Sequence, residues 1–421
     1  MTHRDVTRRD GASPRAAGGG SSAASAPAVT VATIFREGGE TGVHTHFAQL
    51  RGYLERHGTE VAVVTPFSWN RMLTYPVFAP RLVLRRVSPA AAVLWYRYWH
   101  EVFLYRALRQ RLADGREQVI YAQGPLEARA ALRARRGPGQ RVIMAVHFRG
   151  SQADEHAEPG REFKRDGALY RSMRRAEREV ILHVDGLVYV SGWARDALLG
   201  WLPEAADVPS EVIGNGVTPV AAAVGPGQQQ GQEREQHADL VTVGRLDEAK
   251  NHRFLFDVLA EARHQGRSVT LDVYGDGPLR RDLAHRITAL DLDGQVRLLG
   301  FRADVRQQLP AYRAYAHASY AETSSLAIIE AMAAGLPIVA AGIGPIPEIC
   351  EDGAEARFWP LDDPAGAAAM LLELLDSPEA LAAAASAALA RFQRDFDIDV
   401  VGARLRSFLL GSPAGVPARP A

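Results

Sequence analysis

The chain is 421 residues long, 47% hydrophobic and 23% charged, which is typical of a soluble globular protein and favours two domains over one. It contains one cysteine, Cys350, so an intramolecular disulfide and a thiolate metal cluster are both excluded. The formal net charge is zero, and no apolar run approaches the roughly 18 residues that a membrane-spanning helix needs.

The chain begins with an Ala-, Gly-, Ser- and Arg-rich segment, residues 1–27, which lacks the apolar core of a secretory signal and is predicted to be a disordered tail. An N-terminal Rossmann-like domain is predicted over residues 28–212. It starts with an apolar run at 28–35, followed by a Gly-rich turn, a helix at 43–57 and a strand at 61–65. This order predicts a parallel sheet. The turn does not match G-x-G-x-x-G, so the dinucleotide fingerprint is missing.

The middle of this domain is less regular. Residues 67–90 carry Pro, Arg and aromatic residues and are predicted to be an irregular excursion, and residues 91–112 are predicted to be a helix whose aromatic side chains pack in the interior. Three further apolar runs predict buried strands, at 119–122, 142–146 and 186–190. The second of these strands ends at His147, which is either a site residue or a histidine hydrogen-bonded at a strand end.

A turn at 213–217 and a Gly- and Gln-rich stretch at 221–237 lead from the first array into a second one. A C-terminal Rossmann-like domain is predicted over residues 213–394, which alternate strands and helices again. Residues 395–421 are predicted to hold a last helix and a Pro- and Gly-rich tail. The fold class is therefore α/β, with two doubly wound domains facing across a cleft.

The most informative stretch, residues 318–340, is predicted to contain a strand end, a polar turn, a short amphipathic helix and another strand. Ser324 and Ser325 are natural N-cap residues. Glu322 precedes the helix and Glu330 lies within it, so both carboxylates are expected near free backbone N–H groups that favour an anion. A nucleotide sugar offers hydroxyls to the carboxylates and phosphates to the N–H groups. An ordinary surface helix with two solvated acids is the alternative.

Two cations are predicted at the same edge of the second sheet. Arg245 and Lys250 lie in the turn after its first strand, and the helix after Ser325 follows a later strand. In a parallel sheet both positions lie at the carboxyl edge. Two cations and a helix N-terminus form a diphosphate site, and Glu330 could accept two hydrogen bonds from a ribose diol.

These motifs together resemble the GT-B fold glycosyltransferases of the large retaining family 4, over residues 28–410. The most specific piece is Glu322-x7-Glu330 followed by Ala-Met-Ala-Ala-Gly-Leu-Pro-Ile-Val. The supporting pieces are short Gly-containing motifs and a cationic turn: Val243-Gly244-Arg245-Leu246, Lys250-Asn251-His252, Gly275-Asp276-Gly277-Pro278, Leu299-Gly300-Phe301, Gly38-Gly39 and Asn215-Gly216-Val217. The resemblance implies that the first domain binds the acceptor, that the second binds the nucleotide sugar, and that the last helix packs back on the first domain.

The resemblance also implies residue roles. The implied catalytic group brings together two cations at the leaving diphosphate, an acid beside the donor sugar and a histidine near the sugar and acceptor: Arg245, Lys250, Glu322 and His147. The implied donor-binding group contacts phosphate, ribose, sugar and base: Gly39, Gly244, Gly275, Phe301, Ser324, Ser325, Leu326 and Glu330. No metal is expected, because the two cations and the helix N-terminus supply the charge, and no other cofactor is expected either. His44 and His46 are assigned to an acceptor-side surface rather than to catalysis.

One departure concerns the donor. Many relatives carry Gly-Phe-Gly after the first glutamate, where this chain has Thr323-Ser324-Ser325. The sugar-side contacts then differ, so the sequence does not decide between a UDP- and a GDP-sugar. Two other classes of protein remain open at this point. One is a nucleotide-sugar epimerase or NAD-dependent oxidoreductase, and the other is a non-catalytic subunit that binds a nucleotide sugar.

The distribution of charge bears on the acceptor. Residues 1–215 hold 30 Lys and Arg against 22 Asp and Glu, whereas the remainder holds 19 against 27. This asymmetry suggests an anionic partner for the first half, such as a lipid-linked acceptor in polysaccharide or glycolipid assembly or an anionic membrane surface. A solvated Arg-rich surface and a small soluble acceptor such as an aminocyclitol are the alternatives. We expect no nucleic-acid partner. We expect the protein to be cytoplasmic and, if its acceptor is lipid-linked, to contact the inner face of a membrane peripherally.

Overall fold

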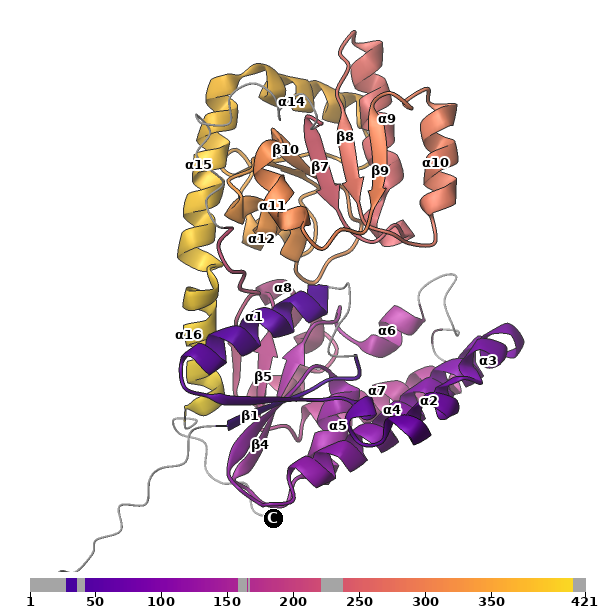
Figure 1. Cartoon of the computed structure of the whole chain (residues 1–421), viewed down its shortest axis with the longest axis vertical. Coiled ribbons are helices and arrows are strands. Elements are labelled where there is room, and N and C mark those ends of the chain that lie inside the picture. The colour runs from indigo at the N-terminus through magenta and orange to yellow at the C-terminus, as the bar shows by residue number, and fades with distance from the viewer. Residues whose placement is uncertain (1–27, 36–41, 158–164, 166, 221–237, 412–421) are drawn as a thin grey trace, which may run out of the picture.

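The computed structural model describes residues 28–35, 42–157, 165, 167–220 and 238–411. The predicted donor contact Gly39 and the Gly- and Gln-rich stretch lie outside these residues. Two six-stranded parallel sheets form the centres of two α/β units, one above the other (Figure 1).

The first sheet has the strand order β2-β1-β3-β4-β5-β6. Its strands are β1 (Ala28–Ala32), β2 (Glu60–Val64), β3 (Gln118–Ala122), β4 (Gln140–Val146), β5 (Gly186–Tyr189) and β6 (Ser210–Val212). The helices that connect them are α1 (Gly42–Arg56), α4 (Pro89–Arg111), α5 (Pro125–Ala134), α6 (Gln152–His156), α7 (Ala168–Ile181) and α8 (Gly192–Leu199). Strands β1 and β3 are buried along their whole length, as their apolar runs predict.

The segment between β2 and α4 corrects the expectation of an irregular excursion. It forms a short 3₁₀ turn, Pro66–Ser68, and two helices, α2 (Arg71–Phe78) and α3 (Arg81–Val87). Helix α2 starts where the Asn70 side chain accepts hydrogen bonds from two backbone N–H groups of the first turn. The Phe78 ring lies 4.2 Å from the ring of His100 and so anchors the two helices on α4.

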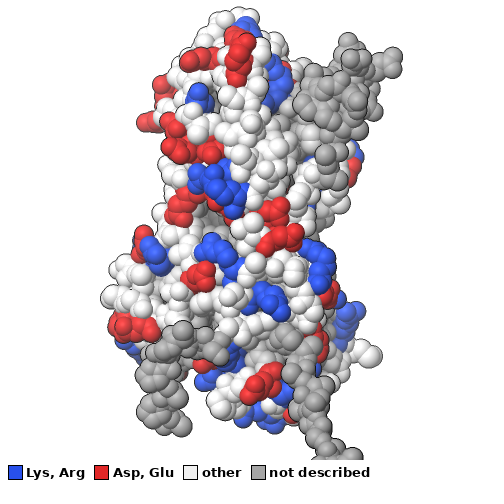
Figure 2. Space-filling model, turned by 90° about the vertical axis from the view of Figure 1, so that its left-hand side faces the viewer, with Lys and Arg blue, Asp and Glu red and all other residues white. Residues whose placement is uncertain are grey.

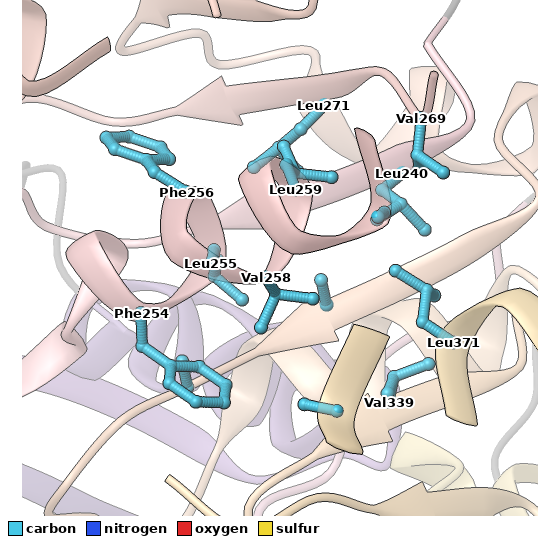
Figure 3. Close-up of a cluster of buried hydrophobic side chains, with 14 of the residues drawn as sticks. Leu240, Phe254, Leu255, Phe256, Val258, Leu259, Val269, Leu271, Val339 and Leu371 are labelled. Carbon is cyan, nitrogen blue, oxygen red and sulfur yellow. The ribbon is translucent and has the colours of Figure 1, made fainter. Parts of the chain in front are cut away.

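The second sheet has the order β12-β11-β10-β7-β8-β9. Its strands are β7 (Leu240–Val243), β8 (Leu271–Tyr274), β9 (Val296–Gly300), β10 (Ala314–His317), β11 (Ile338–Ala340) and β12 (Ala356–Phe358). Its helices are α9 (His252–His264), α10 (Arg280–Ala289), α11 (Val305–Gln308), α12 (Leu326–Ala333), α13 (Ile346–Ile349) and α14 (Pro364–Asp376). Helix α9 packs its apolar face against the sheet and α14, and side chains from all three fill one core (Figure 3).

Two long helices join the units on one side. Helix α15 (Pro378–Asp395) packs on α12, and α16 (Ile398–Leu410) continues down to the first unit (Figure 1). Val401, Leu405 and Leu409 of α16 are buried in the core beneath β1 and α1. A Cβ at Gly402 would lie 2.5 Å from the Tyr53 ring, so only glycine allows this close approach. The α/β class with two doubly wound units is confirmed.

Candidate active site

The carboxyl ends of the two sheets face each other and are hydrogen-bonded. Thr323, in the loop after β10, donates from Oγ1 to the carbonyl oxygen of His147, directly after β4, at 3.1 Å. Ser191, after β5, donates from Oγ to the carbonyl oxygen of Thr323 at 2.9 Å. The loop that the sequence singled out therefore lies where the two units meet.

Glu322, the first glutamate of the motif, forms a cluster of three side chains with Lys250 and His317. Lys250 Nζ lies 2.6 Å from Glu322 Oε1, and His317 Nε2 lies 3.1 Å from the same oxygen. Both Glu322 and His317 are buried, whereas the Lys250 side chain is 31% exposed. Lys250 thus reaches from the turn after β7 to the loop after β10, which explains why one cation and one acid so far apart in the chain form a pair.

The environment keeps Glu322 ionised. Burial alone would raise the pKa of this carboxyl, but the His317 hydrogen bond and the Lys250 charge outweigh it and lower the pKa to about 2. His252 starts α9 beside this cluster, and burial, together with the charges of Lys250 and His317, lowers its pKa to about 4. Near pH 7 Glu322 is therefore a carboxylate, and the neighbouring His252 is neutral.

Two glycines, Gly275 and Gly277, let the backbone turns near Lys250 pack closely. Gly275 has φ +134°, and a Cβ there would lie 1.9 Å from the carbonyl oxygen of Gly244. At Gly277 a Cβ would lie 2.4 Å from the carbonyl oxygen of Leu246. The Lys250 side chain in turn packs on Gly244, with its Cγ and Cδ 3.6 Å from where a Cβ would be. The predicted donor contacts Gly244 and Gly275 are thus neighbours of Lys250.

Helix α12 begins at Leu326, with Ser325 at the N-cap position. Ser325 therefore occupies the expected N-cap position, but it makes no capping hydrogen bond, and its Oγ lies instead 3.4 Å from His317 Nε2. The first N–H groups of an α-helix have no intrahelical partner, so those of α12 are left available for an anion. Asn215 Nδ2 donates to Ser324 Oγ at 2.9 Å, which ties the residue before Ser325 to the segment that connects the two units.

The second glutamate of the motif sits one helical turn further along. Glu330 is largely buried, and Arg306 Nε of α11 lies 3.4 Å from its Oε1. Burial raises the pKa of Glu330, and the Arg306 charge partly opposes this. Because the Arg306 charge partly compensates for this burial, the Glu330 carboxyl group can accept hydrogen bonds from a neutral diol.

The remaining predicted residues lie around this cluster. Arg245 does not join Lys250 at Glu322. Its side chain is 67% exposed, and its Nε lies 3.3 Å from Asp247 Oδ2 in the same turn. His147 Nε2 lies 3.0 Å from Gln123 Oε1, so this histidine is hydrogen-bonded at the end of its strand. Phe301, just after β9, is 46% exposed.

Sequence reasoning missed two residues, His317 and Arg306, which contact the two glutamates directly. His317 is the last residue of β10, at the carboxyl edge of the sheet, and this position could have marked it as a candidate site residue. Arg306 lies on the short helix α11, and nothing in the motif indicated it. Among the described residues, no group of three or more His, Cys, Asp or Glu side chains is placed to hold a metal ion. None of the described helices is long and apolar enough to cross a bilayer.

Comparison with known proteins supports one class of enzyme. A family model described as Glycosyltransferase Family 4 matches residues 41–220, and one described as Glycosyl transferases group 1 matches residues 237–377. The phosphatidyl-myo-inositol mannosyltransferase of Mycolicibacterium smegmatis is 26% identical over 384 residues, which cover 89% of this chain and 92% of that protein. A glycogen synthase of Mycobacterium tuberculosis is 28% identical over 256 residues, covering 59% of each chain.

Solved structures agree on the fold. HepE of Anabaena, in complex with UDP and glucose, superposes with a TM-score of 0.64 at 21% identity, covering 91% of this chain and 99% of that one. A sucrose-phosphate synthase from Thermosynechococcus elongatus gives a TM-score of 0.70 at 17% identity, covering 91% and 98%. The fold is GT-B, and the chain is a glycosyltransferase. It belongs to family 4 of these enzymes, the glycosyl transferases group 1.

Proposed function

We propose that the protein transfers a sugar from a nucleoside diphosphate sugar to a hydroxyl of a lipid-linked acceptor in glycolipid or polysaccharide assembly, with retention of the anomeric configuration and without a metal ion. The observation that carries this proposal is the pair formed by Lys250 and Glu322 beside the start of α12. It places a fixed cation and unoccupied helix N–H groups next to a carboxylate that stays ionised at pH 7.

These groups suit the charges that develop during transfer. Breaking the bond between sugar and phosphate builds negative charge on the diphosphate and positive charge on the sugar ring. Lys250 and the N–H groups of α12 stabilise the first charge in the transition state, and Arg245 can join them by leaving its exposed pair with Asp247. Glu330 binds the ribose hydroxyls. The leaving phosphate takes the acceptor proton, so no step requires a metal ion.

UDP-sugars are the first donors to test. HepE is solved in complexes with UDP, with UDP and glucose, and with UDP-glucose, which supports UDP as the nucleotide of this chain as well. The lipid-linked acceptor is supported by the name of the mannosyltransferase relative, whose match spans most of both chains. A GDP-sugar and a small soluble acceptor are the competing outcomes of the same experiments.

The experiment is a thermal-shift screen of UDP-, GDP-, ADP- and dTDP-sugars, followed by transfer assays with the donor that stabilises the protein. Lys250→Ala and Glu330→Ala are measured separately, with Arg253→Ala, an exposed cation next to the site, as a matched control. We expect Lys250→Ala to lower kcat about 10²–10³-fold, by analogy with loss of an oxyanion-hole donor. We expect Glu330→Ala mainly to weaken donor binding. Undiminished transfer and donor affinity in both variants contradicts the assignment.

Two further readouts test the finer claims. Transfer in excess EDTA should proceed at an unchanged rate if no metal is used. The anomeric proton coupling of the product glycoside should match that of the donor if the configuration is retained.

A further inference from the structure

The segment between β2 and the middle of α4 has an unusual surface. The four most exposed large apolar side chains among the described residues all lie in it: Met72 (87%), Val87 (78%), Val83 (65%) and Tyr98 (62%). Soluble proteins place most such side chains inside, and an accumulation of exposed ones marks a contact surface. Leu73, Tyr75 and Leu94 of the same helices are also exposed.

The exposed apolar residues follow the helical repeat. On α2, Met72 and Tyr75 are three residues apart, and on α3, Val83 and Val87 are four apart. Residues at these spacings lie on one face of a helix. The opposite side of α2 carries the buried Thr74 and the Phe78 ring that packs on α4. Helix α2 is therefore amphipathic, with one side anchored and one side open, and α3 exposes both of its valines.

The charges in this segment have one sign. Between Glu60 and Glu101 the chain has no acidic residue and five arginines: Arg71, Arg81, Arg85, Arg86 and Arg97. Arg71 and Arg86 are exposed, and neither forms an ion pair with a described residue. Elsewhere the surface arginines are mostly paired, and the face formed by α15 and α16 shows both signs side by side (Figure 2). The segment thus combines exposed apolar side chains with unpaired positive charge.

We propose that α2, α3 and the start of α4 form a docking surface for an anionic lipid bilayer. Amphipathic helices with arginine and exposed Met, Leu, Val and Tyr side chains bind at the boundary between headgroups and acyl chains. A protein partner or a second copy would be expected to meet at least some acidic side chains here, whereas a bilayer of anionic lipids requires none. The four side chains that are most exposed enter the acyl boundary, and Arg71 and Arg86 contact the headgroups.

The surface is connected to the acceptor side of the site. Arg97 of α4 donates from Nη1 to Gln152 Oε1 at 3.1 Å. Gln152 starts α6, five residues after His147. The tip formed by α2 and α3 lies on the side of the molecule opposite α15 and α16 (Figure 1). The biological purpose of this surface rests on the proposed lipid-linked acceptor. Bilayer binding itself does not, because it is measured without donor or acceptor.

The first test is co-sedimentation of the full chain with vesicles of phosphatidylcholine alone or mixed with phosphatidylglycerol, at low and high salt. We expect binding to the mixed vesicles that weakens with salt. Met72→Asp combined with Val87→Asp should reduce it at least tenfold, and Arg71→Gln and Arg86→Gln about fivefold each at low salt. Leu389→Asp combined with Val400→Asp, on α15 and α16, is the matched control and should change nothing.

The second test locates the contact. The single cysteine, Cys350, is buried, so a cysteine introduced at an exposed position can be labelled selectively with an environment-sensitive fluorophore. The label at Val83→Cys should shift to the blue on mixed vesicles, whereas the label at Leu389→Cys should not. The proposal is overturned if the wild type does not bind the mixed vesicles, or if the control pair loses binding equally. It is also overturned if sedimentation velocity shows that the Met72 and Val87 changes break a dimer. Each of these results leaves the transfer assays unaffected.

Discussion

Replacing Glu322 by Gln tests the electrostatics of the site most directly. The side chain keeps its shape, but the negative charge that Lys250 and His317 share is lost. The pKa of this carboxyl falls from 4.5 to about 2 in the folded chain. At 1.36 kcal/mol per unit, the ionised carboxylate contributes about 3 kcal/mol to the free energy of unfolding.

The sign of the pH dependence follows from the lowered pKa. Because the folded chain binds this proton less readily than the unfolded chain, the stabilisation is complete above about pH 4.5 and is lost as the pH falls toward 2. We therefore expect Glu322→Gln to be less stable than the wild type by about 3 kcal/mol at pH 7. The difference should shrink between pH 4.5 and pH 2.

The measurement can report on the second unit alone. Of the six tryptophans, Trp359 is the one that follows residue 201, and its Nε1 donates to the carbonyl oxygen of His317 at 3.1 Å. The 19F resonance of 5-fluorotryptophan at this position follows urea unfolding next to the cluster. Glu261→Gln, an acid on the surface of α9, is the control and should cost less than about 0.5 kcal/mol. The reasoning would be refuted if the free energy of unfolding of the wild type exceeded that of Glu322→Gln by less than about 1 kcal/mol at pH 7, or if this difference grew as the pH falls.

Three further changes have outcomes that the structure specifies. Burial lowers the pKa of His100 to about 4, so between pH 6.5 and pH 4 the unfolded chain binds a proton that the folded chain does not. The free energy of unfolding of the first unit should therefore fall over this range. In His100→Phe the fall should be smaller, as measured by urea unfolding followed by circular dichroism. Gly275→Ala forces a Cβ against a carbonyl oxygen and should lower Tm by roughly 6 °C or more, whereas Gly294→Ala, with nothing within 4 Å, should leave it nearly unchanged. Arg306→Met removes the charge that opposes the raised pKa of Glu330, so the loss of donor affinity, measured by calorimetry, should grow as the pH is lowered. A loss that is the same at every pH would contradict this role.

The alternation of strands and helices was predictable because short buried apolar runs and Gly-containing turns are local signals. Helices α2 and α3 were not predicted, although Asn70 is a readable N-cap. Pro76 lies inside α2 and Pro80 is the N-cap residue of α3, and both prolines obscure a helical pattern. Their apolar side chains also face outward, so the periodicity that normally marks a core-facing helix is weak here.

The positions of Lys250 and Glu322 at one sheet edge followed from parallel topology, but the directions of the side chains did not. Arg245 was placed at the same edge, yet its guanidinium turns toward Asp247, which is only two residues away and competes for it. His317 was missed because a strand-end histidine has no motif of its own. Its role depends on the loop folding back, which brings Glu322 next to it only in three dimensions.

The departure from Gly-Phe-Gly gains a physical meaning from the structure. Thr323 and Ser324 use their side chains to contact His147 and Asn215, and Ser325 turns its hydroxyl toward His317. A glycine in place of Thr323 or Ser325 could not make their contacts, and a phenylalanine in place of Ser324 has no oxygen to accept the hydrogen bond from Asn215. The loop that precedes α12 is therefore joined on one side to the first unit and on the other to the cluster around Glu322. A change of sugar specificity in this chain would have to alter residues of both units, because the loop between them is held by both.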